Sequence, residues 1–502
     1  MKVSDAVEIL RREAALTLDA PGDLGAMDLE VASITEDSRR VTSGGLFVAV
    51  SGGGVDGHDF AGAAKQAGAV AILGEREGIA SLEGVPYLHV THARRALGLI
   101  AHELVGQPSH TMTVIGVTGT NGKSSTVSII RQMLESFGHR CAEFGTLGYR
   151  ILDTMHDAPH TTPFGEDLAR LFDEAKRADC THVVMEVSSH SLAQERVAGI
   201  DFDVAVFTNL TQDHLDFHDG IEGYRDVKLK LFERVAGPNA FTVVNADDEQ
   251  SPSFIAASEM PCHTFGLSGE CRISDVQAGP DTTRFAFASP WGDAEVSTHL
   301  LGHHNVMNIA AAMTTCCGLG LPVEWVADHV AKLEPVPGRF EHIATGQDFR
   351  VVVDYAHTDD GLRNILRGIR EITDGRIIAL FGCGGDRDRG KRARMAAAVA
   401  EAADFAVITS DNPRSEDPAR ILLDVEAGMQ HAGKKKNIDY IVVEDRREAI
   451  AEAIGRARPG DVVLLAGKGH ENYQIIGSER IPLDDREVAR EVLQGLAQRG
   501  ER

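Results

Sequence analysis

The sequence predicts an α/β protein with three domains, the second of which contains a mostly parallel sheet. A chain of 502 residues is long enough for about three separate hydrophobic cores. Short β-rich runs alternate with helical stretches in the second and third parts of the chain, which is typical of parallel sheets with crossover helices. Breaker clusters at 106–109 and 335–338 divide the chain into units 1–107, 108–337 and 338–502.

The first unit begins with the segment MKVSDAVEILRREAA, in which apolar and charged residues alternate at helical spacing. We expect an amphipathic helix there and not a signal peptide, because acidic residues interrupt the segment throughout. β-Rich runs follow in all three units. The predicted strands are 46–50, 69–73 and 87–90, then 114–117, 183–187, 204–208 and 241–245, then 351–355, 377–381, 406–409, 441–443 and 462–465.

The most informative segment is a glycine-rich loop, 118–125, between a predicted strand and a predicted helix. Four apolar residues share one face of that helix: Val127, Ile130, Leu134 and Phe137. Glycines in such a loop let backbone N–H groups close around an oligophosphate at a helix N-terminus. Lys123 would reach the terminal phosphates and Ser124 would bind Mg²⁺. Val117 stands where the general pattern has a glycine, so the loop is a variant; the alternative is an ordinary strand–helix turn with a solvated lysine.

Polar side chains follow the predicted strands at the edge where the carboxyl ends of parallel strands meet. They are Glu186 and Ser188, Asn209 with Asp213 and His214, Asp354 and His357, Arg387, Asp411 to Arg414, and residues within 467–471. A single such residue would be an ordinary loop cap. Their recurrence in two units favours a ligand cleft between the second and third units.

The overall charge excludes some classes of partner. A net charge of −25 argues against general binding of nucleic acid or an anionic membrane, for which a basic surface is the usual footprint. An anionic small molecule remains possible as a substrate, because local arginines can outweigh the negative charge of the whole protein. Seven scattered cysteines without a C-x-x-C pair favour reduced thiols in a cytoplasmic protein. No apolar run reaches the ~18 residues of a membrane span, and we expect a monomer.

Several motifs together resemble the Mur ligases, the ATP-dependent amide-forming enzymes of peptidoglycan precursor synthesis. They are TGTNGKSS at 118–125, MEVSSHSL at 185–192, TNLTQDHLDFH at 208–218, GHHNVMN at 302–308, PGRFE at 337–341 and DYAHT at 354–358. The resemblance implies an N-terminal uridine-nucleotide-binding domain, a central domain of the phosphate-loop ATPase type and a C-terminal Rossmann-like domain for the incoming amino acid. ATP and Mg²⁺ are the implied cofactors.

The resemblance also implies the residues of the nucleotide site. The ATP-binding set is Thr118, Gly119, Thr120, Asn121, Gly122, Lys123, Ser124, Ser125, Asn305, Arg339, Asp354 and His357. Asn305 and Asn308 would share a helix face and could read the adenine edge. The implied catalytic residues are Lys123, Glu186, His214 and Lys228, and the implied Mg²⁺ ligands are Ser124, Glu186, His214 and Lys228. For Lys228 the resemblance implies a carbamylated side chain (N6-carboxylysine), whereas a solvated lysine is the ordinary interpretation of a charged helical stretch.

The remaining implied sites hold the two substrates to be joined. The residues for the uridine nucleotide sugar-peptide are Ser38, Thr161, Thr162, Ser188, Gln194 and Arg196. Family members often have a polar trio after Gly52, but this chain has Gly53, Gly54 and Val55 there, which cannot donate from a side chain. The residues for the amino acid are Arg387, Asp411, Asn412, Pro413, Arg414, Gly467 and Glu471.

The segment DNPRSEDP at 411–418 resembles the branch of the family that adds meso-diaminopimelate. This amino acid differs from lysine by a second carboxylate, which Arg414 could bind in a bidentate fork. Glu471 could take the distal ammonium. The resemblance therefore implies a ligase that joins meso-diaminopimelate to UDP-N-acetylmuramoyl-L-alanyl-D-glutamate through an acyl phosphate.

Other functions remain open at this point. The nearest are the lysine-adding ligase, which lacks the arginine of the DNPR segment, and a folylpolyglutamate-type synthase, which lacks the Asp37-Ser38-Arg39 unit. A nucleotide-dependent binding switch is the alternative of another class. Such a switch would keep the phosphate loop but would need neither Glu186 nor Lys228.

Overall fold

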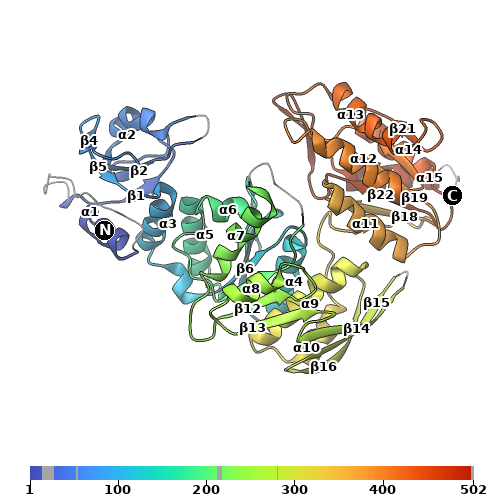
Figure 1. Cartoon of the computed structure of the whole chain (residues 1–502), viewed down its shortest axis with the longest axis horizontal. Coiled ribbons are helices and arrows are strands. Elements are labelled where there is room, and N and C mark those ends of the chain that lie inside the picture. The colour runs from blue at the N-terminus through green and yellow to red at the C-terminus, as the bar shows by residue number, and fades with distance from the viewer. Residues whose placement is uncertain (14–27, 53–54, 212–217, 280, 499–502) are drawn as a thin grey trace.

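The computed structural model describes residues 1–13, 28–52, 55–211, 218–279 and 281–498. It consists of three α/β domains in a row, with the two termini at opposite ends (Figure 1). The predicted fold class is confirmed. His214 and Asp213 lie outside the described residues, as do Gly53 and Gly54. Among the residues described, no helix is long and apolar enough to cross a membrane.

The N-terminal domain is a five-stranded sheet in the order β1-β2-β3-β5-β4, parallel except for β4. Helices α1 and α3 pack on one face and α2 on the other. The elements are α1 (Val3–Arg12), β1 (Ser33–Thr35), β2 (Gly45–Ala49), α2 (Ala61–Ala67), β3 (Ala69–Gly74), β4 (Ser81–Leu82), β5 (Val85–His89) and α3 (Ala93–Leu104).

The central domain contains an eleven-stranded sheet in the order β16-β15-β14-β13-β12-β11-β6-β10-β7-β8-β9. Its middle strands are parallel, and antiparallel strands extend both edges. The elements up to α7 are β6 (Thr113–Thr118), α4 (Lys123–Phe137), β7 (Cys141–Gly145), β8 (Gly148–Ile151), β9 (Thr154–His156), α5 (Gly165–Arg177), β10 (His182–Glu186), α6 (Ser189–Ala193), β11 (Val204–Phe207) and α7 (Gly220–Phe232). The others are β12 (Phe241–Asn245), α8 (Ser251–Ala257), β13 (Cys262–Gly266), β14 (Cys271–Ala278), β15 (Thr283–Ser289), β16 (Gly292–Thr298), α9 (His303–Gly318) and α10 (Val323–Val330).

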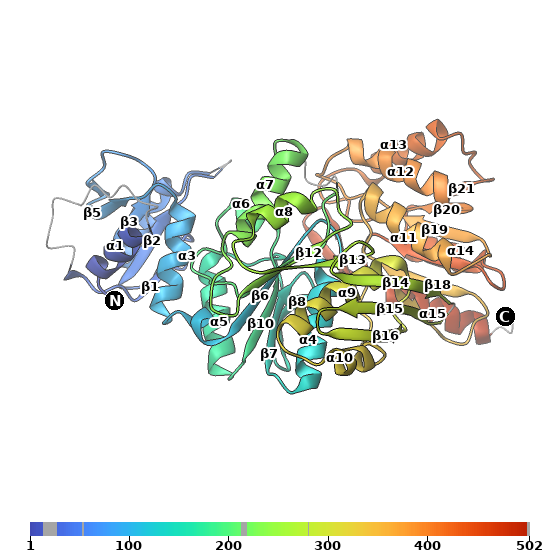
Figure 2. The ribbon, with the colours of Figure 1, turned by 60° about the horizontal axis from the view of Figure 1, so that its bottom comes forward.

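Helices cover both faces of this sheet, because its middle strands are apolar on both sides. Helices α4, α9 and α10 pack on one face, and α5, α7 and α8 on the other. Figure 2 shows α7 and α8 above β12, and α9 and α10 below it. Val127, Ile130 and Leu134 are fully buried in α4, as predicted. Phe137 is not part of this core: it is 42% exposed and contacts the ring of Trp325 edge-on at 4.9 Å.

The C-terminal domain has a six-stranded sheet in the order β17-β18-β22-β19-β20-β21, parallel except for β17. Helices α11, α12 and α13 cover one face, and α14 and α15 the other. The elements are β17 (Glu341–Ile343), β18 (Arg350–Asp354), α11 (Asp359–Glu371), β19 (Ile377–Phe381), α12 (Gly390–Ala402), β20 (Phe405–Ile408), α13 (Pro418–His431), β21 (Tyr440–Val442), α14 (Arg446–Gly455), β22 (Val462–Ala466), β23 (Tyr473–Ile476), β24 (Glu479–Pro482) and α15 (Asp485–Gln498).

All predicted strands are present, with ends within two residues of those expected. The sequence analysis did not predict the antiparallel strands β14, β15 and β16 or the edge strands β8 and β9. The predicted domain boundaries at 107 and 337 stay predictions, since the structure shows where each sheet lies but not where a domain ends.

The first two domains meet through directly packed backbones. A Cβ added to Gly98 of α3 would lie 2.4 Å from the carbonyl oxygen of Ala198, and one added to Gly199 would lie 2.8 Å from that of Gly98. His102, one turn after Gly98, is fully buried against the ring of Phe172 in α5. Close packing of this kind leaves no room for larger side chains, so the N-terminal domain is seated on α5.

Candidate active site

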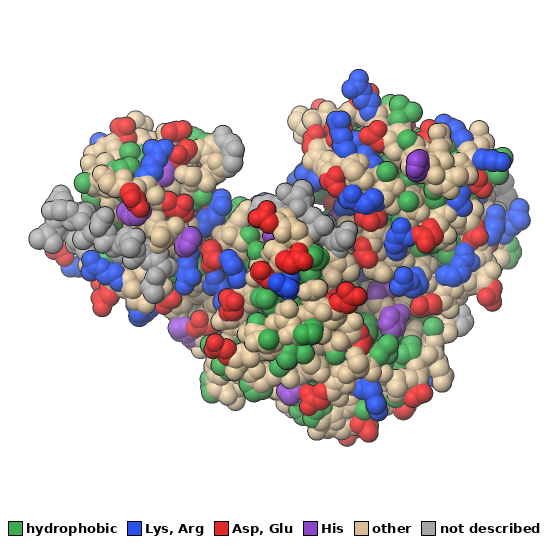
Figure 3. All heavy atoms as spheres, viewed as in Figure 1, with side chains coloured by type: hydrophobic (Ala, Val, Ile, Leu, Met, Phe, Trp, Pro, Cys, Tyr) green, Lys and Arg blue, Asp and Glu red, His purple; other side chains and the backbone are tan. Residues whose placement is uncertain are grey.

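A cleft of about 1880 Å³ lies between the central and C-terminal domains. The phosphate loop and the ends of β10 and β11 line it from the central domain, and the loops after β18, β19, β20 and β22 line it from the C-terminal domain. The space-filling view shows the molecule hollowed above the central domain, beside the C-terminal domain (Figure 3). The predicted cleft between the second and third units is therefore present.

The phosphate loop connects β6 to α4 in a tight turn. Gly122 has φ +84°, a left-handed conformation that favours glycine. A Cβ there would also come within 2.4 Å of the Asn308 side-chain oxygen, so α9 packs directly against the loop. The backbone N–H groups of Thr120 and Asn121 donate to the carbonyl and side-chain oxygens of Asn209, at 2.8 and 2.9 Å. Asn209 therefore holds the loop in shape from the end of β11.

Lys123 folds back over this loop. Its ammonium donates to the carbonyl oxygens of Gly119 at 2.9 Å and Thr120 at 2.8 Å. These are neutral acceptors, so a phosphate group could replace them as a charge-assisted partner. The position agrees with the role predicted for Lys123, which stays a prediction.

A carboxylate and a hydroxyl meet beside the loop. Glu186, at the end of β10, is 2% exposed and accepts from the Ser124 hydroxyl at 2.8 Å. The backbone N–H of Thr146 donates to the same carboxylate oxygen at 2.8 Å. Arg339, which follows the second linker, donates to the Ser124 hydroxyl at 3.1 Å. Two oxygen donors that suit Mg²⁺ thus converge at the start of α4.

Lys228 of α7 is not a solvated lysine. It is 1% exposed, its ammonium donates to the Gly119 carbonyl at 2.9 Å, and it lies 4.5 Å from the centre of the Tyr224 ring. The ordinary interpretation of this lysine is therefore wrong, because α7 folds its inner face over the phosphate loop. Carbamylation of Lys228 stays a prediction.

The other predicted ATP residues lie around the same end of the cleft. Asn305 and Asn308 share one buried face of α9, and Asn308 donates to Asn305 at 3.4 Å. The Asn305 amide also donates to the Leu301 carbonyl at 2.9 Å. Asp354 ends β18 and accepts from the backbone N–H groups of Phe340 and Ala356, at 2.8 and 2.7 Å. Burial raises the pKa of Asp354 above its ordinary value.

Arg339 connects the phosphate-loop end of the cleft to two aromatic residues of the C-terminal domain, Tyr355 and His470. The Arg339 guanidinium lies 4.4 Å from the centre of the Tyr355 ring. His470, on the loop after β22, has its ring centre 5.1 Å from that of Tyr355. Burial and the charge of Arg339 lower the pKa of His470 to about 4, so its imidazole is neutral near pH 7. His357 is exposed at the cleft, with Nδ1 2.9 Å from the Tyr355 carbonyl oxygen.

The predicted sugar-peptide residues of the central domain form one connected group. Thr162 donates to the Glu186 carbonyl at 2.8 Å and accepts from the backbone N–H of Ser188 at 3.1 Å. Arg196 donates to the Thr162 carbonyl at 2.9 Å and to the side-chain oxygen of Gln194 at 2.7 Å. These partners are neutral oxygens, so the guanidinium charge is available to an anionic group. Thr161 lies next to this group and lines the cleft.

Ser38, the remaining residue predicted for the uridine nucleotide, lies in the N-terminal domain. It lies half-buried in the turn after β1 of the N-terminal domain. Asp37 in the same turn has its pKa lowered to about 2, chiefly by hydrogen bonds from Arg39. Whether Ser38 contacts the nucleotide stays a prediction.

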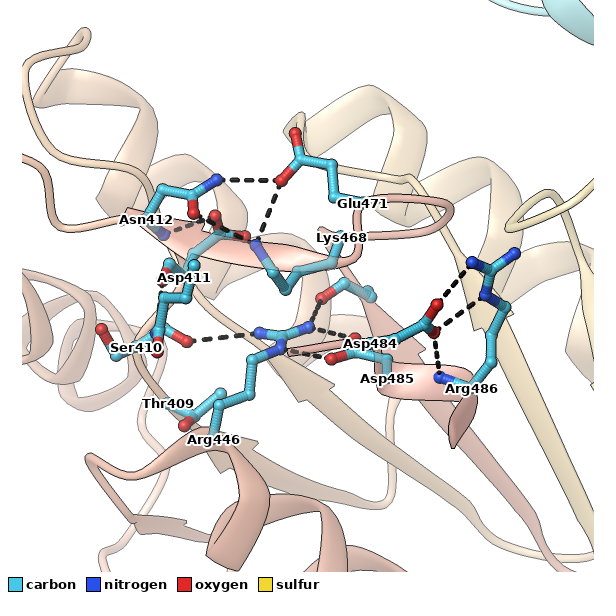
Figure 4. A network of polar contacts seen from close by, with 12 residues as sticks. Thr409, Ser410, Asp411, Asn412, Arg446, Lys468, Glu471, Asp484, Asp485 and Arg486 are labelled. Carbon is cyan, nitrogen blue, oxygen red and sulfur yellow. Dashed lines mark hydrogen bonds and ion pairs between the residues drawn. The ribbon is translucent and has the colours of Figure 1, made fainter. Parts of the chain in front are cut away.

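Three of the predicted amino-acid residues, Asp411, Asn412 and Glu471, belong to a polar network in the C-terminal domain (Figure 4). Asn412 and the buried Lys468 both donate to Glu471 Oε2, at 2.9 and 3.1 Å. Burial alone would raise the pKa of the Asp411 carboxyl, but the charges of Lys468 and Arg446 hold it below its ordinary value. The network fixes Glu471 at the mouth of the cleft, where it can accept from an ammonium group.

Arg414 reaches the same cleft from the DNPR segment. Its backbone has φ +52°, and its N–H donates to the Ile475 carbonyl at 3.0 Å. Its guanidinium Nη1 donates to the Gly385 carbonyl at 2.8 Å. A guanidinium has five N–H donors, so others are available to a carboxylate. Gly467 and the exposed Arg387 line the same cleft, whereas Pro413 is buried and does not line it.

Some residues of the site were not predicted. Arg446 and Asp485 form a bidentate ion pair at 2.8 and 2.6 Å, and both side chains are fully buried below the amino-acid pocket. They are far apart in the chain and lie in different helices, so no local pattern reveals the pair. Thr146 follows a strand, and the strand-end rule could have found it. Asp360 links α11 to the phosphate loop and is described below.

A phosphate loop faces a polar pocket of a second α/β domain across the cleft, an arrangement suited to an enzyme that uses a nucleotide to act on a second ligand. The comparisons with known proteins agree. The Mur ligase family catalytic domain matches residues 30–104, the Mur ligase middle domain 117–316 and the Mur ligase glutamate ligase domain 338–469. The chain therefore belongs to the Mur ligase family, whose members are ATP-dependent, amide-bond-forming ligases.

Relatives with this domain order are similar over nearly their whole length. The UDP-N-acetylmuramoyl-L-alanyl-D-glutamate--2,6-diaminopimelate ligase of Syntrophomonas wolfei is 43% identical over 94% of this chain and 96% of its own. The protein of the same name from Geobacillus thermodenitrificans is 45% identical over 92% and 94%. A solved structure of a protein of that name superposes with a TM-score of 0.68 at 32% identity, over 97% of this chain and 99% of the other.

Proposed function

We propose that this ligase joins meso-diaminopimelate to the D-glutamyl γ-carboxylate of UDP-N-acetylmuramoyl-L-alanyl-D-glutamate, releasing ADP and phosphate, in peptidoglycan precursor synthesis. The observation that carries the proposal is the position of Arg414 in the same pocket as Glu471. Together they offer a cation for the second carboxylate of diaminopimelate and an anion for its distal ammonium. The printed names of the similar proteins support the same substrates.

The chemistry follows from the poor reactivity of a carboxylate. Its leaving group would be an oxide, so ATP first converts it into an acyl phosphate, and an amine then displaces the phosphate. Such a phosphoryl transfer depends on positioning and on electrostatic stabilisation. Lys123 would neutralise the transferred phosphate, and Arg339 would approach it from the C-terminal domain.

Magnesium fits the oxygen donors at the start of α4. Ser124 and Glu186 would hold one ion, with His214 as a further predicted ligand outside the described residues. The ion would screen the charges of the phosphates and the carboxylate. A carbamate on Lys228 would add an anionic oxygen ligand for a second ion.

The carboxylate substrate would lie between the phosphate loop and Arg196. That arginine would bind an anionic group of the sugar-peptide, while Thr161, Thr162 and Ser188 offer hydroxyl groups near Glu186. The amine would arrive from the C-terminal domain on the other side of the cleft. Closure of the domains would bring the two together and would exclude water from the acyl phosphate.

The cysteines favour the reducing cytoplasm as the place of this reaction. All seven are free thiols, which is typical of cytoplasmic proteins. We further infer that the enzyme acts as a monomer, because the residues assigned to all substrates come from one chain.

The test is the release of phosphate in the presence of UDP-N-acetylmuramoyl-L-alanyl-D-glutamate and ATP, with diaminopimelate or lysine as the amine. We expect release with diaminopimelate and at least about 10⁴-fold lower kcat/KM with lysine, because lysine would leave the guanidinium unpaired. A higher kcat/KM with lysine than with diaminopimelate would favour the lysine-adding function, and equal values would show that the site does not select between them. No release with either amino acid, but tight ATP binding, would favour a nucleotide-dependent switch.

A further inference from the structure

A carboxylate of helix α11, in the C-terminal domain, accepts hydrogen bonds from the central domain at the phosphate loop. One oxygen of Asp360, Oδ2, accepts from the Asn121 side-chain amide at 2.9 Å and from the Thr211 hydroxyl at 2.8 Å. Asn121 is part of the phosphate loop and Thr211 follows β11, so both donors belong to the central domain. Asn364, one turn further along α11, donates to the same oxygen at 3.2 Å. One oxygen atom of Asp360 therefore connects the two domains at the phosphate loop, in addition to the hydrogen bond from Arg339 to Ser124.

The position of Asp360 is well defined by its helix. Thr358 caps α11 by accepting from the backbone N–H of Gly361 at 2.9 Å, which places Asp360 in the first turn. The same turn contains a second carboxylate, Asp359, whose nearest cation is Arg394 of its own domain at 3.8 Å. The two neighbouring acids thus differ in one respect: Asp360 contacts the central domain through hydrogen bonds, and Asp359 pairs within the C-terminal domain.

The charge of Asp360 makes this contact sensitive to nucleotide. Its three donors are uncharged, so they hold the carboxylate without neutralising it. A triphosphate in the loop would bring several negative charges close to Asn121 and hence to Asp360. Like charges repel more strongly in a partly desolvated cleft than in water. The contact should therefore be less favourable beside a filled loop than beside an empty one.

We propose that Asp360 is an interdomain latch that positions the C-terminal domain against the empty phosphate loop and is released by the charge of bound nucleotide. The proposal rests on the nucleotide-binding role of the loop in the proposed function. Linkage makes the effect reciprocal: if nucleotide weakens the latch, the latch weakens nucleotide binding by the same factor. Release would free the C-terminal domain to move with its amine substrate only after the nucleotide has bound.

The experiment measures two quantities that do not require ligation. The first is the Kd of a non-hydrolysable ATP analogue, by calorimetry. The second is the distance between the domains, by energy transfer between dyes on Leu267→Cys and Ile438→Cys. Both of these positions are more than half exposed, one in each domain. The variants are Asp360→Ala, which removes the contact and the charge, and Asp360→Asn, which keeps an acceptor oxygen without the charge.

For Asp360→Ala we expect binding of the analogue to tighten by about threefold to tenfold. Its energy transfer without nucleotide should already equal the value that the wild type reaches with the analogue. For Asp360→Asn we expect tighter binding as well, but a smaller change of energy transfer on binding, because the contact persists. Asp359→Asn is the matched control and should behave as the wild type in both measurements.

Unchanged affinity and unchanged energy transfer in Asp360→Ala would overturn the proposal. Weaker binding of the analogue would also overturn it, because Asp360 would then support the nucleotide-bound form. An Asp360→Asn variant that matches the wild type would exclude the role of charge. If Asp360→Ala does not fold, Asp360→Asn alone decides, since it is nearly isosteric. Neither readout involves the amino acid, so failure of the diaminopimelate assignment would leave this test intact, and the reverse also holds.

Discussion

Replacing Arg414 by alanine would test whether this side chain selects the amino acid. The guanidinium is held over the pocket by its hydrogen bond to the Gly385 carbonyl and by its backbone pairing with Ile475. Alanine keeps a Cβ at φ +52°, so the backbone strain stays the same and only the charged group is lost. The substitution therefore reports on the contact with substrate.

The size of the effect follows from the kind of contact proposed. Truncating one side of a desolvated, hydrogen-bonded charge pair costs about 2–5 kcal/mol. At 1.4 kcal/mol per factor of ten, this is a loss of about 30-fold to several thousand-fold in kcat/KM for diaminopimelate. Arg414→Lys keeps the charge but not the bidentate fork, so we expect an intermediate loss. Lysine, which has no second carboxylate, should be affected far less by either change.

The assay is kcat/KM for diaminopimelate and for lysine in the wild type and both variants. Arg420→Ala is the control, because this arginine is solvent-exposed on α13. The Kd values of ATP and of the uridine nucleotide should remain unchanged, because Arg414 is not among the residues assigned to those two ligands. Wild-type kinetics with diaminopimelate in Arg414→Ala would refute the reasoning, as would a wild-type enzyme that uses lysine equally well.

Four further substitutions test other parts of the structure. Lys123→Ala should abolish phosphate release without loss of thermal stability, because the side chain binds loop carbonyls and lies outside the core. Lys228→Ala should be nearly inactive and partly rescued by short carboxylates such as acetate if the lysine is carbamylated; an active variant would contradict this. Asp485→Asn should lower the free energy of unfolding by about 3–5 kcal/mol in urea titrations, because it leaves the buried Arg446 charge uncompensated. Burial lowers the pKa of His102 to about 3, whereas an unfolded histidine titrates near 6.5. The unfolded chain therefore binds a proton that the folded chain excludes, and stability falls by about 1.4 kcal/mol per pH unit as the pH drops below about 6.5. His102→Leu should remove that part of the pH dependence between pH 6.5 and 5, and an unchanged slope would contradict the burial argument.

The features that were predicted from the sequence are those that depend on residues close together in the chain. The phosphate loop is defined by glycines and a lysine within eight positions, and buried parallel strands are apolar runs whatever their partners. The antiparallel strands β14 and β15 were missed although their exposed and buried residues alternate along the strand. A search for continuous apolar runs does not detect a sheet that is solvated on one face.

The features that could not be predicted depend on contacts between segments that are distant in the sequence. The burial of Lys228 arises because α7 folds over the phosphate loop, more than a hundred residues earlier in the chain. The pairing of Arg446 with Asp485 requires two helices to meet below the sheet edge. Phe137 was expected in the core, but it lies at the last turn of α4, where the helix leaves the sheet.

The glycine contact between the first two domains decides which part of the enzyme can move. With backbone against backbone at Gly98 and Gly199, the N-terminal domain has no sliding layer of side chains on which to shift. The substrate that donates the acyl group and the ATP that donates the phosphoryl group would then be bound by two domains that do not move relative to each other. The amine would travel on the C-terminal domain. Activation of the carboxylate and arrival of the nucleophile would then be separate steps in time.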